Sequence, residues 1–225
     1  MPGQRATEAT RHEQILNAAF VVAVRDRLDG LTIRAVAKQA GLSSGLVHFH
    51  FTSRDTLLLE LLDWLLERTI IGDPTEEILS KPTATLRLTA FLRQEFLLLP
   101  ERRARLELFF DFWVAGMGNK KIRERIRRAL EVYRSALLPL AEEVVREAPE
   151  RFPDVSGIEF AGLVLAVIQG FVMQAIVDPQ SLDLDRVFAS VQALVLPVAA
   201  AGVDRVKVTT ADRGVRAKKG RLPSR

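Results

Sequence analysis

Apolar residues recur at helical spacing in almost every segment between the glycine and proline breakers, and this pattern constrains the fold more than any other feature of the chain. Ile15, Ala18, Ala19 and Val22, for example, lie at positions i, i+3, i+4 and i+7 of one helix face. Runs that alternate apolar and polar residues between hairpin turns are absent from the sequence. The sequence therefore predicts an all-α protein.

The breakers divide the chain into nine predicted helices. Their approximate ranges are 8–27, 33–40, 44–49, 54–71, 84–99, 101–117, 120–148, 156–177 and 183–201. Capping patterns precede four of them, at Thr10 with Glu13, Thr32, Ser43, and Ser156 with Glu159. Residues 203–225 have little apolar periodicity and many Lys, Arg, Gly and Pro, so we expect a disordered basic tail there.

Charge is distributed unevenly along the chain. Residues 1–54 carry 7 Lys and Arg against 4 Asp and Glu, residues 55–202 carry 17 against 22, and residues 203–225 carry 8 against 2. A basic end joined to an acidic, apolar body indicates a module that binds a polyanion and is attached to a second domain. We therefore divide the chain into a domain over residues 1–54, a helical domain over residues 55–202, and the tail.

The sequence offers few residues for catalysis or metal binding. It has no cysteine, and its three histidines, His12, His48 and His50, all lie in the first 50 residues. Two histidines that are two positions apart on a helix diverge by about 200° and cannot share a metal ion. We expect no metal, no cofactor and no catalytic site. Acid–base catalysis by carboxylates alone, such as Glu107 with Asp111, stays open.

One segment requires a membrane test. Residues 160–177 carry no formal charge over 18 positions, which is close to the minimum for a spanning helix. The segment contains Gln169 and Gln174, however, and a helix that is apolar on all sides also suits a subunit interface. We expect a homodimer through residues 156–201 and no membrane contact. The polar start of the chain has no signal-peptide pattern, so we expect a cytoplasmic protein.

The most informative stretch is residues 31–58. A short predicted helix, a turn at Gly41 and a second short helix form a helix-turn-helix pattern, whose second helix enters the major groove of DNA. Gly41 can take the positive φ that the turn requires. Ala37 is small where the two helices cross, and Val47 supplies an apolar contact between them.

Residues suited to phosphate contacts accompany this pattern. Thr32 and Ser43 cap the two helices, and the free N–H groups at helix N-termini can receive phosphates. Arg54 begins the next helix as a further phosphate partner. That helix is the only covalent route to the helical domain, and its apolar residues can grip both parts of the chain; they are Leu57, Leu58, Leu61, Leu62 and Leu65.

The same stretch resembles the TetR family of transcriptional regulators. The residues that carry the resemblance are Thr32-Ile33-x-x-Val36-Ala37, Ala40-Gly41-Leu42-Ser43-x-Gly45 and Val47-His48-Phe49-His50-Phe51-x-Ser53-Arg54-x-x-Leu57-Leu58. Over residues 80–202 the helix number and lengths agree, with a looser similarity to the BetI-like branch around Phe110-x-Phe112-Trp113. The resemblance implies a nine-helix homodimer, in which an N-terminal three-helix domain binds DNA and a helical domain binds a ligand and dimerises.

The resemblance also implies which residues contact a pseudo-palindromic operator in double-stranded DNA. Arg34, Ser44, Leu46 and His50 would face the bases, and Thr32, Ser43, His48 and Arg54 would hold phosphates. His48 stands where the family usually has a phosphate-binding tyrosine. Leu46 stands where a threonine is common and could meet a thymine methyl group. For Phe49 and Phe51, in contrast, we expect packing in the core.

The helical domain is expected to hold a ligand. The helices over residues 84–148 carry many of the aromatic residues, and those around position 110 cannot all face one way. We expect a mainly apolar pocket with a few polar groups, lined by Phe109, Phe110, Trp113, Met117, Tyr133, Gln169 and Met173. Trp113 and Tyr133 also suit a cation. The predicted effector is therefore a small molecule that is mainly apolar or cationic.

Together these features favour a sequence-specific DNA-binding regulator and not an enzyme. The favoured hypothesis is a repressor that a small molecule releases from its operator by changing the separation of two recognition helices. Two other classes stay open. One is a helical scaffold protein, and the other is a carboxylate-dependent enzyme with an accessory DNA-binding module.

Overall fold

The computed structural model describes residues 7–69, 72–178 and 183–195. Within these residues it contains ten α-helices and no strands, which confirms the predicted all-α class. The helices are α1 (Glu8–Gly30), α2 (Ile33–Ala40), α3 (Ser44–His50), α4 (Arg54–Glu67), α5 (Glu76–Leu79), α6 (Ala84–Leu97), α7 (Leu99–Gly118), α8 (Lys120–Glu147), α9 (Gly157–Val177) and α10 (Leu184–Val195). Nine of them correspond to the predicted helices, and the short α5 is the addition.

Most helix ends lie close to the predicted positions. Helix α4 ends at Glu67 and not near residue 71, and α1 extends to Gly30. Pro100, which was expected to separate two helices, lies instead in the first turn of α7, where the missing N–H of proline loses no hydrogen bond. The tail over residues 203–225 and the end of the last predicted helix lie outside the described residues.

Side-chain caps fix where the helices begin. Thr32, Ser43 and Ser156 each accept a hydrogen bond from the backbone N–H three residues further on, as predicted. The cap predicted for the first helix was wrong. Thr7, and not Thr10, occupies that position and accepts from the Thr10 N–H at 3.2 Å. The two hydroxyls also bond to each other at 2.7 Å, and the helix begins at Glu8, as its predicted range has it.

The last turn of α1 is distorted at Arg27. This residue has φ 60° and ψ 177°, a conformation that costs a non-glycine residue on the order of 1–3 kcal/mol. The interruption lies where the sequence predicted the helix to end. The Arg27 guanidinium forms an ion pair of 3.1 Å with Asp111 on α7, and this contact ties the distorted turn to the second half of the chain.

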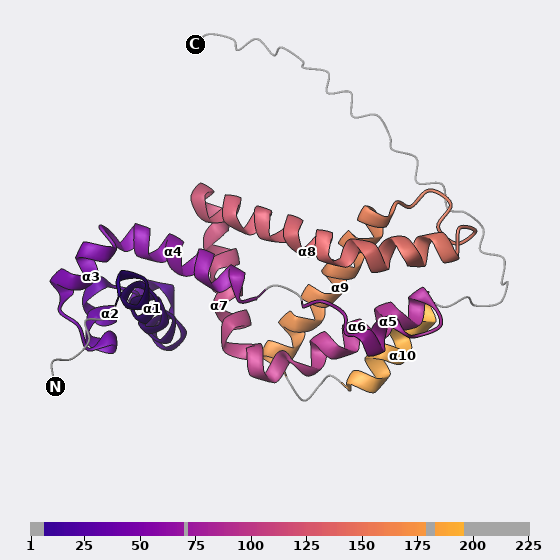
Figure 1. Cartoon of the computed structure of the whole chain (residues 1–225), viewed down its shortest axis with the longest axis horizontal. Coiled ribbons are helices and arrows are strands. Elements are labelled where there is room, and N and C mark those ends of the chain that lie inside the picture. Colours follow the sequence, from indigo (N-terminus) through magenta and orange to yellow (C-terminus); the bar gives the residue numbers. More distant parts are fainter. Residues whose placement is uncertain (1–6, 70–71, 179–182, 196–225) are drawn as a thin grey trace, which may run out of the picture.

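The helices form an N-terminal unit, a connecting helix and a body (Figure 1). Helices α1–α3 pack together at one end of the molecule, and we call them the N-terminal unit. Helix α4 leads away from this unit, and α5–α10 form the body. Helix α7 contacts both α1 and α4, and α8 contacts α4 as well, so the body reaches back to the N-terminal unit.

One hydrophobic core joins the N-terminal unit to the body. It contains buried side chains of α1–α4, including all five predicted leucines of α4. The body contributes Leu108 and Phe112 from α7 and Ile122 and Ile126 from α8. A second core lies within the body, between α6, α8, α9 and α10. Because the first core crosses the junction, a displacement of α7 must move side chains that pack against α4.

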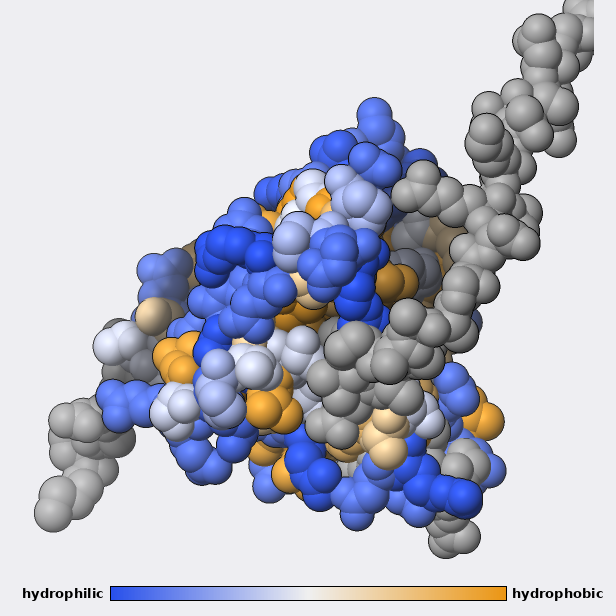
Figure 2. Space-filling model, turned by 90° about the vertical axis from the view of Figure 1, so that its right-hand side faces the viewer, coloured by the Kyte–Doolittle hydropathy of each residue, from blue (hydrophilic) through white to orange (hydrophobic). Residues whose placement is uncertain are grey.

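Helix α9 has a long apolar surface that the chain covers only in part. By length and composition alone it could span a membrane, and 28% of its most apolar 18-residue stretch is buried. Leu163, Met173 and Val177 are exposed by 59%, 54% and 85%. Figure 2 shows that apolar surface also interrupts the hydrophilic surface at the body end of the molecule. A helix at a subunit interface has this same composition.

The turn between α2 and α3 provides a test of the fold. Gly41 has φ 67°, and a Cβ added there would meet no atom within 4 Å, so Gly41→Ala should act only through left-handed backbone strain. We expect the free energy of unfolding, measured by urea denaturation, to fall by about 1–2 kcal/mol. Gly45→Ala is the matched control, because its Cβ also has open space but lies within α3. That variant should lose no stability; equal losses in both would contradict the strain argument.

Candidate nucleic-acid interface and ligand cavities

Helices α2 and α3 form a closed helix-turn-helix. The Leu42 N–H donates to the Ala37 carbonyl at 2.9 Å, and Gly41 takes its left-handed conformation in the turn. Val36, Ala37 and Val47 are buried in the core that joins the N-terminal unit to the body, which we call the shared core. The expected contacts between the two helices are therefore present, and only the opposite face of α3 is available to another molecule.

The outer face of α3 carries residues predicted to contact DNA. Ser44 and His48 are exposed, whereas Leu46 and His50 are half-buried. Gly45 is exposed on the same helix and has no side chain, so another molecule can approach the backbone closely there. The structure thus brings these predicted residues together on one short helix.

Phe49 does not pack in the core, contrary to the prediction. Its side chain is 76% exposed and makes an edge contact with the His50 ring, with 5.4 Å between ring centroids. Phe51 is fully buried and stacks on His12, as predicted. Position 49 lies about 200° around the helix from Val47. A helix of two turns that buries Val47 must therefore turn Phe49 outward, toward solvent.

Among the described residues, the capping hydroxyls of Thr32 and Ser43 donate their protons to no other group. Each oxygen accepts a backbone N–H, from Ala35 at 3.1 Å and from Leu46 at 3.2 Å. A hydroxyl group that accepts one hydrogen bond can still donate its proton, here to a phosphate oxygen. Both residues are exposed at the start of their helices, which suits that role.

The two predicted arginine contacts have different surroundings. Arg34 is exposed on the first turn of α2, and no ion pair restrains it within the described part of the chain. Arg54 is exposed as well, but its guanidinium donates to the carbonyls of Leu28 and Leu31, both at 2.7 Å. These bonds satisfy carbonyl groups at the end of α1. Arg54 therefore helps to hold the N-terminal unit together, and only its remaining N–H donors are left for a phosphate.

The residues predicted to line one ligand pocket are not brought together in one cavity, and Tyr133 also lines a wider hollow of about 520 Å³ between α4 and α8. A cavity of about 60 Å³ within the body is lined by four of them: Phe109, Phe110, Tyr133 and Gln169. Trp113 and Met117 line a different groove of about 230 Å³, between α7 and the first half of α8. Met173 is 54% exposed and lines neither. The aromatic residues of α7 thus face two different surfaces.

A further cavity of about 60 Å³ adjoins the first one, and we call the pair the inner cavities. They share four lining residues, Thr69, Leu106, Ile168 and Val172. The second cavity adds Glu95 and Arg102, which form an ion pair of 2.7 Å. Glu95 was not predicted, although a signal existed. It lies on the same helical stripe of α6 as the buried residues Leu88 and Phe91.

Two polar atoms at the inner cavities make no hydrogen bond among the described residues. They are the Glu95 Oε1 atom and the Tyr133 hydroxyl, and both are buried. Burial raises the pKa of Tyr133 to about 12, although the neighbouring Thr69 hydroxyl opposes this shift. The phenol therefore stays protonated at neutral pH. Tyr133 can donate a hydrogen bond to a ligand, and Glu95 can accept one.

The carboxylates left open for acid–base catalysis are both engaged in ion pairs. Glu107 pairs with Arg103 at 2.7 Å, and Asp111 pairs with Arg27 at 3.1 Å. Burial raises the pKa of Asp111, while Arg27 acts in the opposite direction. Neither carboxylate lines the inner cavities. Their contacts place them in structural roles on α7.

A short helix, a glycine turn and a second short helix with an exposed outer face define a helix-turn-helix DNA-binding protein. Residues 15–61 match the family described as bacterial regulatory proteins of the tetR family, and residues 84–197 match the C-terminal domain of BetI-type transcriptional repressors. The second match covers half of the chain, and the chain belongs to the TetR family of transcriptional regulators. The resemblance seen in the sequence, including that to the BetI-like branch, is confirmed.

Curated relatives match over most of the chain. An uncharacterized helix-turn-helix regulator from the dhlA 5′ region of Xanthobacter autotrophicus is 25% identical over 183 residues, which is 81% of this chain and 88% of that protein. The BetI regulator of Vibrio vulnificus is 23% identical over 178 residues, which is 78% of this chain and 86% of that protein. Both relatives are transcriptional regulators by name.

Solved structures share the fold. A transcriptional regulator from Pseudomonas aeruginosa has a TM-score of 0.71 and 21% identity, with 85% of this chain and 91% of that chain covered. FadR of Bacillus subtilis, in complex with stearoyl-CoA, has a TM-score of 0.59, 21% identity and coverage of 82% and 97%. A regulator from Saccharomonospora viridis, in complex with choline, has a TM-score of 0.62, 20% identity and coverage of 84% and 96%.

The exposure of Phe49 leads to a prediction about DNA binding. Phe49→Ala should weaken binding to specific DNA by roughly 1–3 kcal/mol, because an apolar contact to a base edge is lost. It should leave the thermal midpoint nearly unchanged, because the ring is 76% exposed. Phe51→Ala is the contrast, since its ring is fully buried and its loss should destabilise the fold by about 3–5 kcal/mol. Fluorescence anisotropy and thermal melts measure the two effects; unchanged affinity in Phe49→Ala would remove this residue from the interface.

Proposed function

We propose that this chain is a repressor that binds a pseudo-palindromic operator in double-stranded DNA and leaves it when a small molecule binds the body. The observation that carries this proposal is the exposed outer face of α3. Val47 packs the opposite face in the core, and the capping hydroxyls of Thr32 and Ser43 can each still donate a proton to a phosphate. Ligand-responsive regulation is typical of the family. We place the protein in the cytoplasm, without membrane contact.

The residues at the operator have two different tasks in this proposal. Phosphates are held by Thr32, Ser43, His48 and Arg54, and base edges in the major groove are met by Arg34, Ser44, Leu46 and His50. Phe49 joins the second group, because its exposed ring suits a thymine methyl group. Phosphate contacts set position and affinity, whereas base-edge contacts set the sequence that is recognised.

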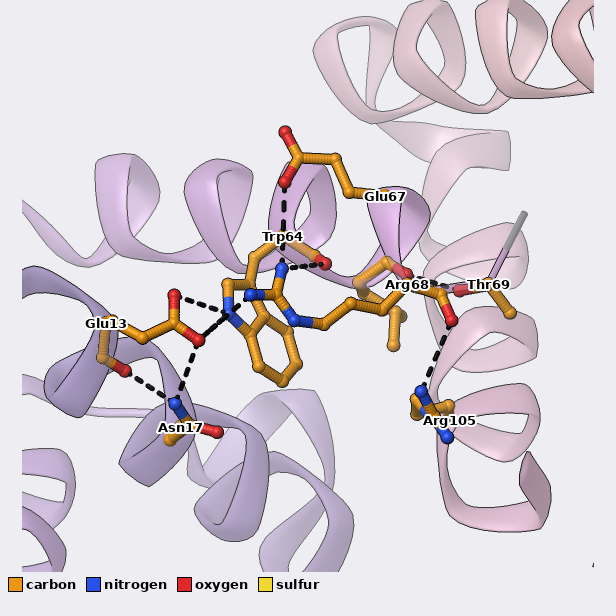
Figure 3. A network of polar contacts seen from close by, with 8 residues as sticks. Glu13, Asn17, Trp64, Glu67, Arg68, Thr69 and Arg105 are labelled. Carbon is orange, nitrogen blue, oxygen red and sulfur yellow. Dashed lines mark hydrogen bonds and ion pairs between the residues drawn. The ribbon is translucent and has the colours of Figure 1, made fainter. Parts of the chain in front are cut away.

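A polar network links the end of α4 to α1 (Figure 3). Arg68 donates to Glu13 at 2.9 Å and lies over the Trp64 ring, 4.2 Å from its centroid. The Trp64 indole N–H also donates to Glu13 at 3.0 Å, and this bond is the main reason why the pKa of the Glu13 carboxyl is below its usual value. Thr69, the next residue after Arg68, lines both inner cavities. A ligand there would touch a residue that adjoins this network.

Helix α7 offers a second route from ligand to DNA. Phe109 and Phe110 line an inner cavity, while Leu108 and Phe112 pack in the shared core and Asp111 pairs with α1. A ligand that displaces α7 would therefore change the placement of α1. A ligand shifts such an equilibrium only by its difference in affinity for the two states, so a hundredfold release from DNA requires about 2.7 kcal/mol.

The effector in this proposal is a small molecule that is mainly apolar or cationic. The inner cavities are lined mainly by apolar side chains, which supports an apolar ligand. The Bacillus subtilis protein is in complex with stearoyl-CoA, which joins a long apolar acyl chain to an anionic coenzyme A group, and the Saccharomonospora viridis protein is in complex with the cation choline.

We also propose that α9 and α10, within residues 156–201, pair with the same helices of a second copy. The exposed apolar residues of α9 support this, because a soluble monomer rarely leaves such a continuous surface in water. An isologous two-fold contact would cover the surface on both copies at once. Two N-terminal units about 34–36 Å apart could then enter successive major grooves of one operator.

A gel-shift titration tests the DNA-binding proposal. The probe is a duplex that covers the region upstream of the gene that encodes this chain, and a random duplex of the same length is the control. We expect specific binding to be at least roughly 10³-fold tighter than binding to the random duplex at the same salt concentration. Equal affinity for the two duplexes would refute the operator proposal.

Leu163→Glu tests the dimer. The residue is 59% exposed in the single chain, so the substitution should cost little folding stability but place two carboxylates in the apolar interface. We expect a monomer by sedimentation velocity at micromolar concentration, together with a large loss of operator affinity. Val114→Glu is the matched control, because Val114 is 65% exposed on α7, outside the proposed interface. An unmodified chain that sediments as a monomer would contradict the proposal.

A further inference from the structure

The inner cavities contain two buried polar groups that make no hydrogen bond among the described residues. Glu95 is 7% exposed and its Oε1 can accept a hydrogen bond, and Tyr133 is 6% exposed and its hydroxyl can donate one. Neighbouring side chains cover both atoms, so a ligand in the adjoining cavity reaches them by displacing those side chains. A buried polar group without a partner destabilises the protein, and a ligand atom of the right kind removes that penalty. The two groups are therefore expected to select a ligand with one donor and one acceptor.

The negative charge of Glu95 is already compensated by a neighbouring residue. Arg102 Nη1 bonds to Glu95 Oε2 at 2.7 Å, and both residues line the same inner cavity. A cation that approached Oε1 would also lie close to the Arg102 guanidinium, and like charges repel strongly in a buried site. A quaternary ammonium group, moreover, has no proton to donate. A neutral O–H or N–H group suits Oε1 better.

Apart from these residues and the polar side chains of Thr69 and Gln169, the lining is apolar and includes aromatic rings. Phe96 lines one inner cavity, and Phe109 and Phe110 line the other. Edge and offset contacts with these rings favour an aromatic ligand. One water molecule needs about 10–15 Å³ of cavity volume. Each cavity of about 60 Å³ therefore has room for roughly four to six waters. The two cavities together suit a ligand of roughly ten non-hydrogen atoms.

We propose that the effector is a small uncharged molecule with an apolar ring, a hydroxyl or N–H donor that bonds to Glu95 Oε1, and a carbonyl or ether oxygen that accepts from the Tyr133 hydroxyl. This inference rests on the proposed function and narrows it, because it selects the apolar class of effector over the cationic one. It also assigns ligand recognition to the inner cavities and not to the groove lined by Trp113 and Met117.

Two described residues that follow α4, Thr69 and Gly72, lie against the proposed site. Thr69 lines both inner cavities, follows Arg68 directly (Figure 3), and donates its hydroxyl to the Leu65 carbonyl of α4. Gly72 lies near Glu95, since a Cβ added at Gly72 would be 3.5 Å from Oε1. A ligand atom at Oε1 therefore lies beside the chain segment that leaves the connecting helix.

A series of three aromatic probes tests the proposal by isothermal titration calorimetry on the full chain without DNA. 4-Hydroxyacetophenone has a donor and an acceptor, acetophenone lacks the donor, and 4-ethylphenol lacks the acceptor. We expect 4-hydroxyacetophenone to bind about tenfold more tightly than either of the others, because each of those leaves one buried polar group unpaired. Choline, as the cationic probe, should bind most weakly of all.

Two substitutions assign the two polar contacts. Tyr133→Phe removes only the hydroxyl, so it should weaken 4-hydroxyacetophenone about tenfold and leave 4-ethylphenol unchanged. It should change the thermal midpoint of the free chain little, because the neighbouring Thr69 hydroxyl acts on that phenol but lies beyond normal hydrogen-bond geometry among the described residues. Glu95→Gln keeps an oxygen for Arg102 and places an NH₂ donor where Oε1 was. The preference for 4-hydroxyacetophenone over acetophenone should then become smaller, because the phenol loses its charged acceptor and can only accept a weaker bond from the amide. Met117→Leu, in the other groove, is the matched control and should change neither affinity, because Met117 is exposed and does not line the inner cavities.

The outcomes separate this inference from the proposed function. Equal affinities for the three aromatic probes, or tighter binding of choline, would overturn the effector proposal while leaving repression by another ligand class intact. Loss of the probe preference in Met117→Leu would overturn the assignment to the inner cavities. Failure to bind operator DNA, in contrast, is measured by gel shift and would refute the proposed function whatever the calorimetry shows.

Discussion

The burial of α4 in a core that it shares with both parts of the chain is the constraint on which the rest of the structure depends. Its five leucines pack in one cluster with side chains of α1 and with Leu108 and Phe112 of α7. Full burial of such a side chain stabilises a protein by about 1.5–3 kcal/mol. Separation of the N-terminal unit from the body would expose many of them together. The two parts are therefore joined by packing, and a change in one must be accommodated by the other.

Polar contacts at this junction give the packed core its orientation. Arg68 joins α4 to Glu13 of α1, and Arg27 joins the distorted end of α1 to Asp111 of α7. Partly exposed ion pairs of this kind contribute about 0–1 kcal/mol each, far less than the core. Their geometry nevertheless distinguishes one placement of the helices from another that buries the same apolar groups. The core supplies most of the stability, and these contacts select the arrangement.

Features that depend on local sequence could be predicted, whereas features that depend on which face a neighbour covers could not. The helices and the caps at Thr32 and Ser43 follow from spacing and residue type within a few positions. Phe49 and Glu95 are different: both residues were placed by what packs against their helices, which turned an aromatic ring outward and a carboxylate inward. The same dependence divides Trp113 from Phe109, only four positions away on α7.

The core that crosses the junction also determines which pieces of this protein can be exchanged with a relative. A chimaera cut after residue 54 would pair a foreign N-terminal unit with leucines and α7 side chains that were shaped for another surface. A transplant that keeps its packing must carry α4 along with the matching residues of α7 and α8. Variation in operator sequence can accumulate on the outer face of α3 and variation in effector within the inner cavities. The residues of α4, α7 and α8 that pack at the junction, in contrast, can change only together, because each contacts the others.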